Sequence, residues 1–507
     1  MFLEAIKLFF TLDVLLSCFV GVVGGMVIGA LPGLSASMAV ALLIPITFQM
    51  SPAAGLVLLV SVYTSAIYGG SITACLIHTP GTPSSAATAL DGFPLTQRGE
   101  GLKAVGISTL ASAFGGTLSA FALLLVAPSL AKISLWFSSM EYFMLAVFGL
   151  SIIGSLAGES MVKGLMSGVF GLFIGCVGLD IMNGVPRFTF GVIALESGIQ
   201  LVPAMIGLFS ISQVMISVED MIKGKDRILD DDVMNLNGRL LPTAKEMKRI
   251  LPVMSISSIL GILIGILPGA GADIGSWVAY NTAKKNSKHP EEFGNGSIEG
   301  IAASESANNA VTGGALIPLL TLGIPGSGVT AIMLGGLMIK GLVPGHRLFT
   351  EQGNITYCII FGFLIANLLM GVIGLLVAKQ IVKVSVVPMA ILCPIIIGLS
   401  AIGAYAINLS MVDVYVMVIF GIIGYFVRKL GFATAPIVLG LILGPMAEQN
   451  WRQALVLSRG DMLGYFFSRP ISIILFLLVI VGLFSPMLMK IFNKKTMGDP
   501  DVVAAED

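Results

Sequence analysis

Charged residues are scarce in this sequence. Of 507 residues only 11 % are charged, and 28 Lys and Arg balance 28 Asp and Glu, whereas about 25 % is usual in a soluble domain. Hydrophobic residues make up 56 %, and the mean hydropathy is +0.97. A soluble chain of this composition would expose large apolar patches. The composition therefore predicts a polytopic membrane protein and excludes intrinsic disorder. Without a basic surplus, it also argues against a nucleic-acid partner.

Signatures of catalysis and of metal binding are also missing. The five cysteines are scattered and form no C-x-x-C pair, so we expect neither a disulfide framework nor a transition-metal site. No G-x-x-x-x-G-K-[ST] loop is present, which argues against ATP-driven transport. An intramembrane hydrolase would need a nucleophile and a base, and Ser84 near His78 is the only candidate pair, without a third group. We therefore predict a protein that is not an enzyme and has no cofactor.

Long charge-free stretches point to many membrane crossings. No charged residue lies between Val14 and Leu90, whereas Glu219–Arg249 holds 14 charges. One span takes about 20 apolar residues, so we expect an all-α fold of about 10–12 transmembrane helices plus re-entrant, broken-helix hairpins. The expected parts are a first membrane half (1–218), a charged connecting loop (219–250), a second membrane half (251–468), and a last transmembrane helix with a polar tail (469–507).

An internal repeat is visible in the glycine-rich segments. The peptide IGALPGLSA (28–36) reappears as IGILPGAGA (264–272), and GGSITACLIHTPGTPSSAAT (69–88) is matched by GGALIPLLTLGIPGSGVTAI (313–332). Each copy then runs into a predicted Gly…Pro turn, at 92–94 and at 341–344. Three landmarks in the same order indicate a duplicated chain. The broken segments are expected near 28–36 and 69–94 in the first repeat, and near 264–272 and 305–345 in the second.

Pro-Gly pairs within apolar segments predict broken helices. The residues expected to break them are Pro32, Gly33, Pro80, Pro268, Gly269 and Pro325. In lipid, such a break survives only where protein or a water-filled cavity satisfies the freed backbone groups. Paired breaks in two halves of a chain are typical of a transporter binding site, and the helix N-termini that they create suit anions.

Small and hydroxylated residues surround these breaks. The predicted substrate-binding residues are Thr79, Gly81, Thr82, Ser84, Ser85, Asn308, Asn309, Gly326, Ser327 and Gly328. Their hydroxyl groups and bare amides could hold a carboxylate, although no arginine lies within either break. The alternative interpretation is that they only permit close helix packing.

Three residues are candidates for binding a coupling cation, which would be Na⁺ or H⁺. Glu305 is the only acid between Gly300 and Ile339, and an acid at membrane depth costs about 2.5–3.5 kcal/mol on insertion scales. The alternative is that Glu305 lies in a loop just outside the bilayer. Asp273 and Asn309 are the other candidates, and Asn309 could equally form a plain interhelical hydrogen bond. His78 could contact an anion or sense pH, or be a packed neutral histidine, while Asp91 and Arg98 are expected to anchor the 92–94 turn at the interface.

The segments ALPGLSASMAVALLIP, YGGSITACLIHTPGTPSSAATALDGFP, ILPGAGADIGSWVAY and ESANNAVTGGALIPLLTLGIPGSG resemble the large membrane subunit of the tripartite tricarboxylate transporters, the TctA type. The resemblance covers essentially the whole chain. It implies a multi-pass protein of the bacterial inner membrane that works with a small four-helix membrane subunit and a periplasmic solute-binding protein. It also implies uptake of citrate or another carboxylate, driven by a Na⁺ or proton gradient.

The family motifs fall on 80–85 and on 305–328. The chain departs from the family pattern at His78, Ser304 and Asp273, where asparagine, proline and a neutral residue are common, and these departures put the identity of the substrate in doubt. We expect two inverted repeats that form an elevator-like core with the hairpin tips meeting near the membrane midplane. The chain could form a homodimer, and the substrate could be another organic acid. A channel is a less favoured interpretation.

Overall fold

The structure is a computed structural model that describes residues 2–31, 34–79, 81–151, 161–180, 183–224, 239–267, 271–384 and 389–481. Its residues group into two compact units: unit 1 is Met1–Leu135 with Gln200–Lys429, and unit 2 is Trp136–Ile199 with Leu430–Asp507. This grouping follows contacts within each unit, so the expected division into two membrane halves stays a prediction.

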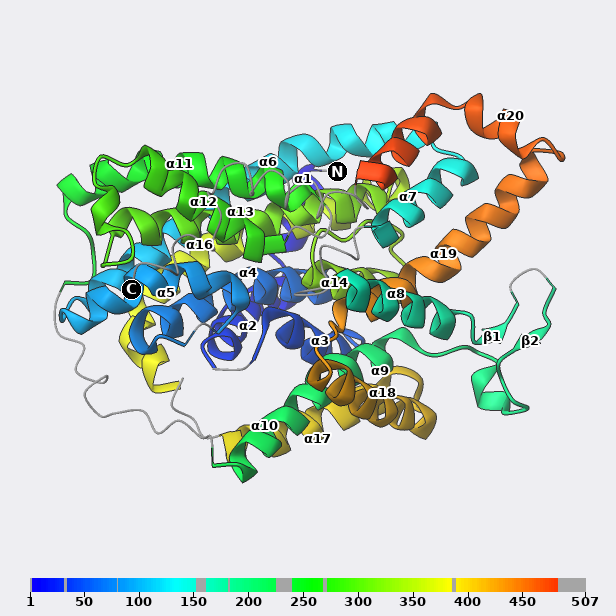
Figure 1. Ribbon diagram of the computed structural model, residues 1–507, viewed down its shortest axis with the longest axis horizontal. Coiled ribbons are helices and arrows are strands. Elements are labelled where there is room, and N and C mark those ends of the chain that lie inside the picture. The colour runs from blue at the N-terminus through cyan, green and yellow to red at the C-terminus, as the bar shows by residue number, and fades with distance from the viewer. Residues whose placement is uncertain are drawn as a thin grey trace, which may run out of the picture. The chain divides into compact units, whose positions relative to one another are not determined.

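The helices of unit 1 carry the repeats (Figure 1). They are α1 (Phe2–Phe9), α2 (Leu12–Gly29), α3 (Ala36–Thr47), α4 (Pro52–Ile77), the 3-10 turn η1 (Pro83–Ser85), α5 (Ala86–Gln97), α6 (Gly101–Ile133), α9 (Leu201–Ile206), the π-helical segment η5 (Gly207–Ile211), α10 (Ser212–Ile222), α11 (Ala244–Ile266), α12 (Gly271–Asn286), α13 (Ile298–Leu322), α14 (Gly328–Ile339), α15 (His346–Thr350), α16 (Gly353–Val384), α17 (Met389–Asn408) and α18 (Met411–Lys429).

Unit 2 is smaller. Its elements are α7 (Ser139–Ser151), α8 (Met161–Gly175), the short strands β1 (Gly178–Leu179) and β2 (Pro186–Arg187), α19 (Ala435–Leu457), α20 (Met462–Phe467) and a final apolar helix, Pro470–Val481. Helices α8 and α19 approach closely because Gly171 lies directly against the backbone of Ile437. Arg187 of β2 binds Glu448 of α19 at 2.7 Å, and Arg452 of the same helix binds Glu448 at 2.6 Å.

The prediction of an all-α, multi-pass membrane protein is confirmed. Eight helices in the described part of the chain are long and apolar enough to cross a membrane. Five further apolar helices have 10–17 residues within the described ranges. The charged connection between the halves contains the start of α11, because Thr243 caps this helix and Glu246 accepts a hydrogen bond from the Thr243 N–H group at 2.7 Å.

Each repeat contains two parallel helices joined by a shorter returning helix. In the first repeat, a Cβ atom on Gly25 would lie 2.7 Å from the Val62 carbonyl oxygen of α4. In the second repeat, a Cβ atom on Gly261 would lie 2.5 Å from the Ala307 oxygen of α13. Contacts continue in the same sense along both pairs. Glycine is therefore required for the approach of α2 to α4 and of α11 to α13, since any side chain would collide with backbone.

The order of contacts between the repeats fixes their relative direction. Helix α6 contacts α13 through Ser112–Glu305 and Ser119–Gly313. Helix α4 contacts α16 through Val57–Gly362 and Tyr68–Gly374. Helix α6 contacts α16 through Thr109–Gly374 and Gly116–Asn367. Residue numbers rise together in the first two helix pairs and in opposite senses in the third. Helices α4 and α13 are therefore antiparallel, and the two repeats are inverted.

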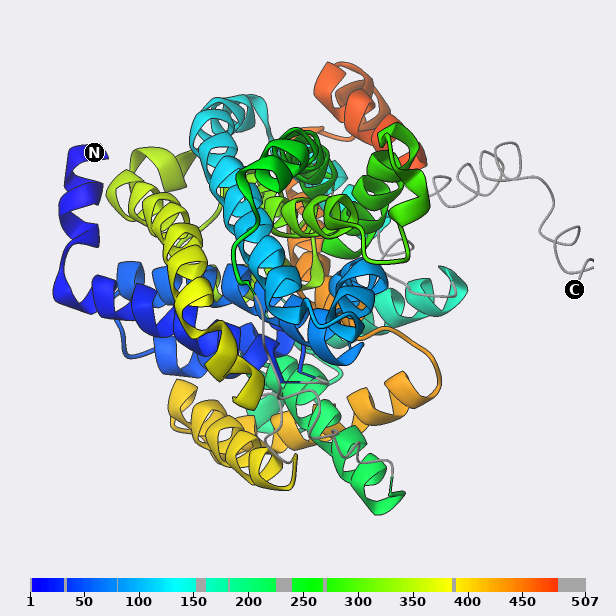
Figure 2. The same ribbon diagram turned by 90° about the vertical axis from the view of Figure 1, so that its left-hand side faces the viewer.

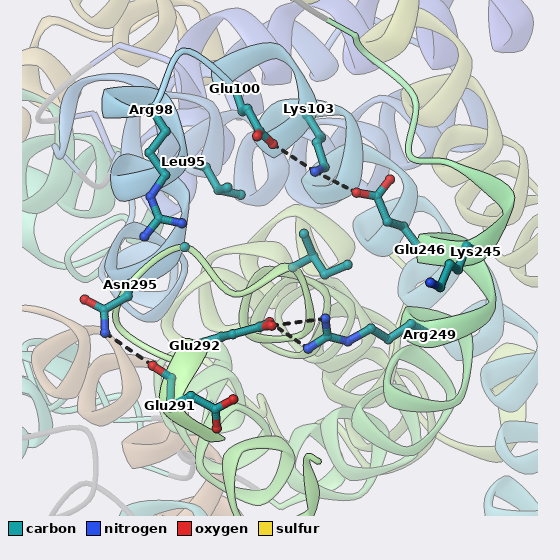
Figure 3. Close-up of a pocket in the computed structure, with 12 residues that line it drawn as sticks. Leu95, Arg98, Glu100, Lys103, Lys245, Glu246, Arg249, Glu291, Glu292 and Asn295 are labelled. Atoms are coloured by element: carbon teal, nitrogen blue, oxygen red, sulfur yellow. Dashed lines mark hydrogen bonds and ion pairs between the residues drawn. The ribbon is translucent and has the colours of Figure 1, made fainter. Parts of the chain in front are cut away.

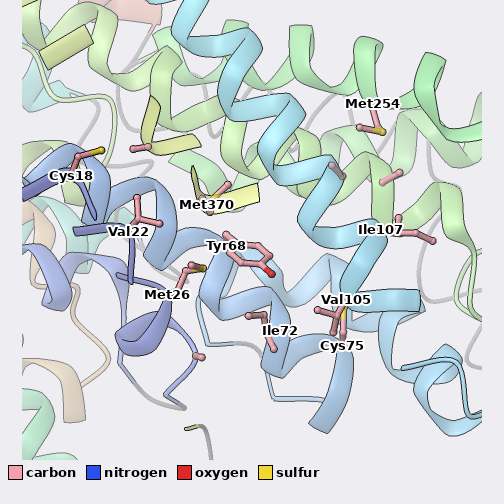
Figure 4. Packing of buried hydrophobic residues seen from close by; sticks show 14 of the residues in the cluster. Cys18, Val22, Met26, Tyr68, Ile72, Cys75, Val105, Ile107, Met254 and Met370 are labelled. Carbon is pink, nitrogen blue, oxygen red and sulfur yellow. The ribbon is translucent and has the colours of Figure 1, made fainter. Parts of the chain in front are cut away.

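The apolar core of unit 1 is built where helices of both repeats meet. Figure 4 shows Tyr68 of α4 among Met26, Met370 and Ile72, with its hydroxyl turned toward α6, where it pairs with Thr109 at 2.7 Å. Figure 2 shows α16 (yellow) lying between the N-terminal helices (blue) and α6 (cyan), in agreement with its contacts to α1, α2 and α6. The core thus holds the central helices α4 and α13 away from lipid.

One predicted turn is wrong. Residues 92–94 lie inside α5, which continues to Gln97. A Cβ atom on Gly92 would lie 2.5 Å from the Cys75 sulfur, so this glycine allows α5 to pack on α4 and does not form a turn. The matching segment of the second repeat does follow a helix end, and Gly341 there has a left-handed φ of 69°.

Candidate functional site

The two central helices cross at a polar contact. The Asn309 amide of α13 donates to the backbone oxygen of Thr64 at 3.2 Å and to its hydroxyl at 3.1 Å. The Thr64 hydroxyl donates in turn to Asn367 of α16 at 2.7 Å. All three side chains are fully buried. Because α4 and α13 belong to opposite repeats, this hydrogen-bonded contact ties the repeats together at the centre of the core.

Glu305 lies near this crossing, two turns into the continuous helix α13. Its side chain is 0 % exposed, so the interpretation as a loop residue is wrong. One carboxylate oxygen accepts a hydrogen bond from Thr88 at 2.5 Å, and the other accepts one from Ser112 at 2.8 Å. Among the described residues, no lysine or arginine forms an ion pair with Glu305. A buried carboxylate of this kind is stable when it is protonated or when it binds a cation.

The first hairpin tip turns back alongside α4 after Ile77. His78 takes a left-handed φ of 51°, and the Gly81 N–H group donates to the Gly70 oxygen at 3.1 Å. Ser85 donates to the same oxygen at 3.1 Å, and Ser84 pairs with Thr82 at 3.0 Å. These hydroxyls are buried. The tip is therefore an ordered polar turn inside the core.

The second hairpin tip repeats this construction. Helix α13 ends at Leu322, Gly323 has a left-handed φ of 73°, and Ser327 caps α14 by accepting from the Thr330 N–H group at 3.3 Å. The Tyr63 hydroxyl of α4 lies 3.3 Å from the Ser327 hydroxyl. The tip of the second repeat therefore contacts the central helix of the first repeat.

In both tips, the glycine that follows the proline allows a close approach to the backbone of the preceding helix. A Cβ atom on Gly81 would lie 2.4 Å from the Gly29 oxygen at the end of α2. A Cβ atom on Gly326 would lie 2.7 Å from the Gly265 oxygen near the end of α11. The first tip also reaches the opposite repeat, because Thr88 contacts Glu305. The tips are thus arranged crosswise, each on the central helix of the other repeat.

Asn308 has an unusual environment one helical turn after Glu305. It is 0 % exposed and its side chain lies beside the Glu305 carboxylate, but within the described ranges neither its amide nitrogen nor its amide oxygen makes a hydrogen bond of normal geometry. The oxygen of Asn309 is also buried without a partner there. Leaving a buried polar group unpaired costs about 1–3 kcal/mol. These two amides therefore mark a place where a ligand, an ion or water would be stabilised.

The structure brings most of the predicted residues to these two tips and to α13. Thr79 follows the end of α4 and is half-buried, and Gly328 is the first residue of α14. Pro325 lies between α13 and α14, as a helix break requires. The other predicted breaks, namely Pro32, Gly33, Pro80, Pro268 and Gly269, lie outside the described residues, as does the side chain of Asp273. His78 is exposed and packs edge-to-face on Phe93, so it is not a buried histidine.

Sequence reasoning missed several residues of this constellation, including Tyr63, Thr64, Ser112 and Asn367. Tyr63 and Ser112 contact Ser327 and Glu305. One signal was available, since the buried helix α4 and the neighbouring part of α6 carry hydroxyl groups in otherwise apolar sequence. The sequence does not indicate which of these hydroxyl groups contact the tips, because this depends on the inverted packing of the repeats.

Two charged residues anchor the loops that precede the central helices. One oxygen of the buried Asp91 accepts from the N–H groups of Gly294, Gly296 and Ser297 at 2.8–3.0 Å, just before α13. Lys340 donates to the backbone oxygens of Phe48 and Met50 at 2.9 and 2.8 Å, just before α4. Burial raises the pKa of the Asp91 carboxyl, and the N–H donors oppose this. Asp91 thus anchors a loop of the other repeat, and not a turn at the interface.

A charged hollow of about 470 Å³ lies beside the Asp91 anchor. Figure 3 shows Lys103 between Glu100 and Glu246, and Arg249 bound to Glu292. Arg98 is exposed at its rim. Because acids and bases alternate around this hollow, it has no strong preference for an anion, and the hairpin tips remain the better candidate for the substrate.

Comparisons with known proteins show which family the chain resembles. A family model described as the tripartite tricarboxylate transporter TctA family matches residues 15–439. An Agrobacterium vitis protein described as "Uncharacterized 52.8 kDa protein in TAR-I ttuC' 3'region" is 40 % identical over 455 residues, which cover 90 % of this chain and 89 % of that protein. A second protein of the same organism, from the TAR-II ttuC' 3'region, is 39 % identical over 247 residues, covering 49 % of this chain and all of that protein. No solved structure matches the chain.

Proposed function

Because the chain belongs to the tripartite tricarboxylate transporter TctA family, we propose that it is the large translocation subunit of a binding-protein-dependent secondary transporter in a bacterial inner membrane. Its substrate is a tricarboxylate such as citrate, or a related carboxylate. A periplasmic solute-binding protein delivers the substrate, and a small four-helix membrane subunit completes the system. The family match and the multi-pass helical fold support this proposal.

The crosswise arrangement of the hairpin tips, each on the central helix of the other repeat, is the observation that carries the proposed site. A carboxylate held between the tips would accept hydrogen bonds from Ser84 and Ser85 on one side and from Ser327 on the other. The N-terminus of α14 adds backbone N–H groups and the positive end of a helix dipole. The buried amide of Asn308, beside Glu305, would contribute a further donor and acceptor.

Glu305 is proposed to bind the coupling ion, which is Na⁺ or a proton. A cation on Glu305 would remove the cost of a buried negative charge before a second anion, the substrate, enters the core. The oxygen of Asn309 is a further ligand for Na⁺. Since the repeats are inverted, exchange of their roles would open the site to one side and then to the other, in an elevator-like movement.

Four single alanine substitutions test the site. Ser84→Ala, Ser85→Ala, Asn308→Ala and Ser327→Ala should each lower citrate uptake into membrane vesicles that also contain both partner subunits. Ser255→Ala is a matched control, since this hydroxyl bonds only to the Leu251 backbone oxygen of its own helix. Wild-type uptake in all four variants, at normal protein levels, would contradict the proposed site. Uptake of another organic acid alone, with the same variants impaired, would change only the substrate.

A further inference from the structure

A second hollow, distinct from the hairpin tips, lies between α11 and α12. It measures about 440 Å³, and Pro252, Val253, Ile256 and Ala283 contribute its apolar wall. The wall continues along α11, where Ile256, Ile259 and Leu263 are 53–57 % exposed. Helix α11 is long and apolar enough to cross a membrane, so this wall faces lipid. We call the hollow the α11–α12 groove.

One end of the groove carries positive charge that no acid among the described residues neutralises. Lys288 lines the groove just after α12 ends. Nearby lie Lys284 and Lys285 in the last turn of α12 and Lys245 and Lys248 in the first turns of α11, and all five lysines are exposed. None of these five lysines has an ion-pair partner among the described residues.

The neighbouring acids are already engaged. Glu246 binds Lys103 at 2.6 Å, while Glu292 and Glu299 bind Arg249 at 2.6 and 2.7 Å. Figure 3 shows the Glu246–Lys103 and Glu292–Arg249 pairs, with Lys245 joined to neither of them. Glu291 is exposed and lies near His289, which leaves the lysines in clear excess over free acids.

We propose that the α11–α12 groove binds one anionic phospholipid. An acyl chain would lie along the apolar wall, and the phosphate would face Lys288, with Lys285 in the adjoining last turn of α12. A soluble anion would gain nothing from the apolar wall, and a zwitterionic lipid would gain little from the lysines. Basic pockets between transmembrane helices are suited to anionic headgroups, with about 1 kcal/mol for each lysine near the surface. Because loops rich in lysine and arginine face the cytoplasm, the lipid comes from the cytoplasmic leaflet.

Native mass spectrometry of the delipidated full chain tests this proposal. The protein is titrated with phosphatidylglycerol, with phosphatidylcholine of the same chains, and with glycerol 3-phosphate. Phosphatidylglycerol should bind first and most tightly. Lys288→Gln and Lys285→Gln should each weaken it about fivefold, which corresponds to about 1 kcal/mol. Lys132→Gln is the control, because it removes an exposed lysine at the other end of α6 without a described ion pair.

A variant of the apolar wall separates lipid binding from general attraction to charge. Val253→Trp would fill the groove and should weaken phosphatidylglycerol while leaving all lysines in place. Equal binding of phosphatidylcholine, equal binding of glycerol 3-phosphate, or an equal loss in Lys132→Gln would overturn the proposal. Retained phosphatidylglycerol affinity in both Lys288→Gln and Val253→Trp would overturn it as well.

Discussion

Replacing Glu305 by glutamine should abolish the coupling of substrate transport to an ion gradient while leaving the protein folded. The wild-type carboxylate is fully buried without a described cation, and it accepts hydrogen bonds at 2.5 and 2.8 Å. Glutamine keeps the size and one acceptor oxygen, and the second hydroxyl can turn to accept from the new amide group. The rearranged hydrogen bond costs about 1 kcal/mol, and removal of a buried charge offsets this cost. We therefore expect a folded variant with nearly unchanged thermal stability.

Transport should change far more than stability. Glu305→Gln can bind neither a proton nor Na⁺ through a carboxylate, so gradient-driven accumulation in proteoliposomes should disappear. Exchange of labelled for unlabelled substrate across the membrane, which needs no net ion movement, should persist. Glu299→Gln is the matched control on the same helix. It removes the negative charge from the 2.7 Å ion pair with Arg249 and should lower stability while leaving accumulation coupled. Normal accumulation by Glu305→Gln would refute this reasoning.

Three other predictions concern the packing of the tips and loops. Gly81→Ala and Gly326→Ala place a Cβ atom 2.4 and 2.7 Å from backbone oxygens. Each should therefore lower the free energy of unfolding by about 1–3 kcal/mol and reduce uptake. Gly24→Ala should be neutral, because a Cβ atom there would meet nothing within 4 Å. Asp91→Ala leaves three N–H groups without their acceptor and should lower the thermal midpoint, unlike the isosteric asparagine variant, which should lower it less. Lys340→Met removes two hydrogen bonds to backbone oxygens and should cost about 1–3 kcal/mol in denaturant unfolding; an unchanged midpoint would contradict the anchor.

The repeat and the broken helices could be predicted from sequence because they depend on local chemistry. A Pro-Gly pair favours a helix break because proline removes an N–H donor and glycine permits a sharp turn, and the pair at Pro325–Gly326 lies between α13 and α14. Glu305 could be singled out as the only acid in a charge-poor stretch. Its position within a helix could not be predicted, because a polar, glutamate-containing sequence is equally compatible with a loop outside the bilayer.

The direction of the repeats and the crosswise contacts required the structure. A glycine that permits close packing has the same sequence signal as a glycine in a turn, which is why Gly92 was assigned to a turn although it packs against Cys75. Partners such as Tyr63 for Ser327 lie far apart in the chain and meet only because α4 and α13 are antiparallel. No local pattern encodes such a pairing.

The central claim is that both hairpin tips hold one carboxylate. Equilibrium binding of labelled citrate to the purified, reconstituted chain tests it most directly, with Ser84→Ala, Ser327→Ala and the double variant compared at equal folded amounts. The account predicts weaker binding in each single variant, because each removes a hydroxyl from a different repeat, and a further loss in the double variant. Wild-type affinity in either single variant would show that its tip does not contact the ligand and would contradict the account.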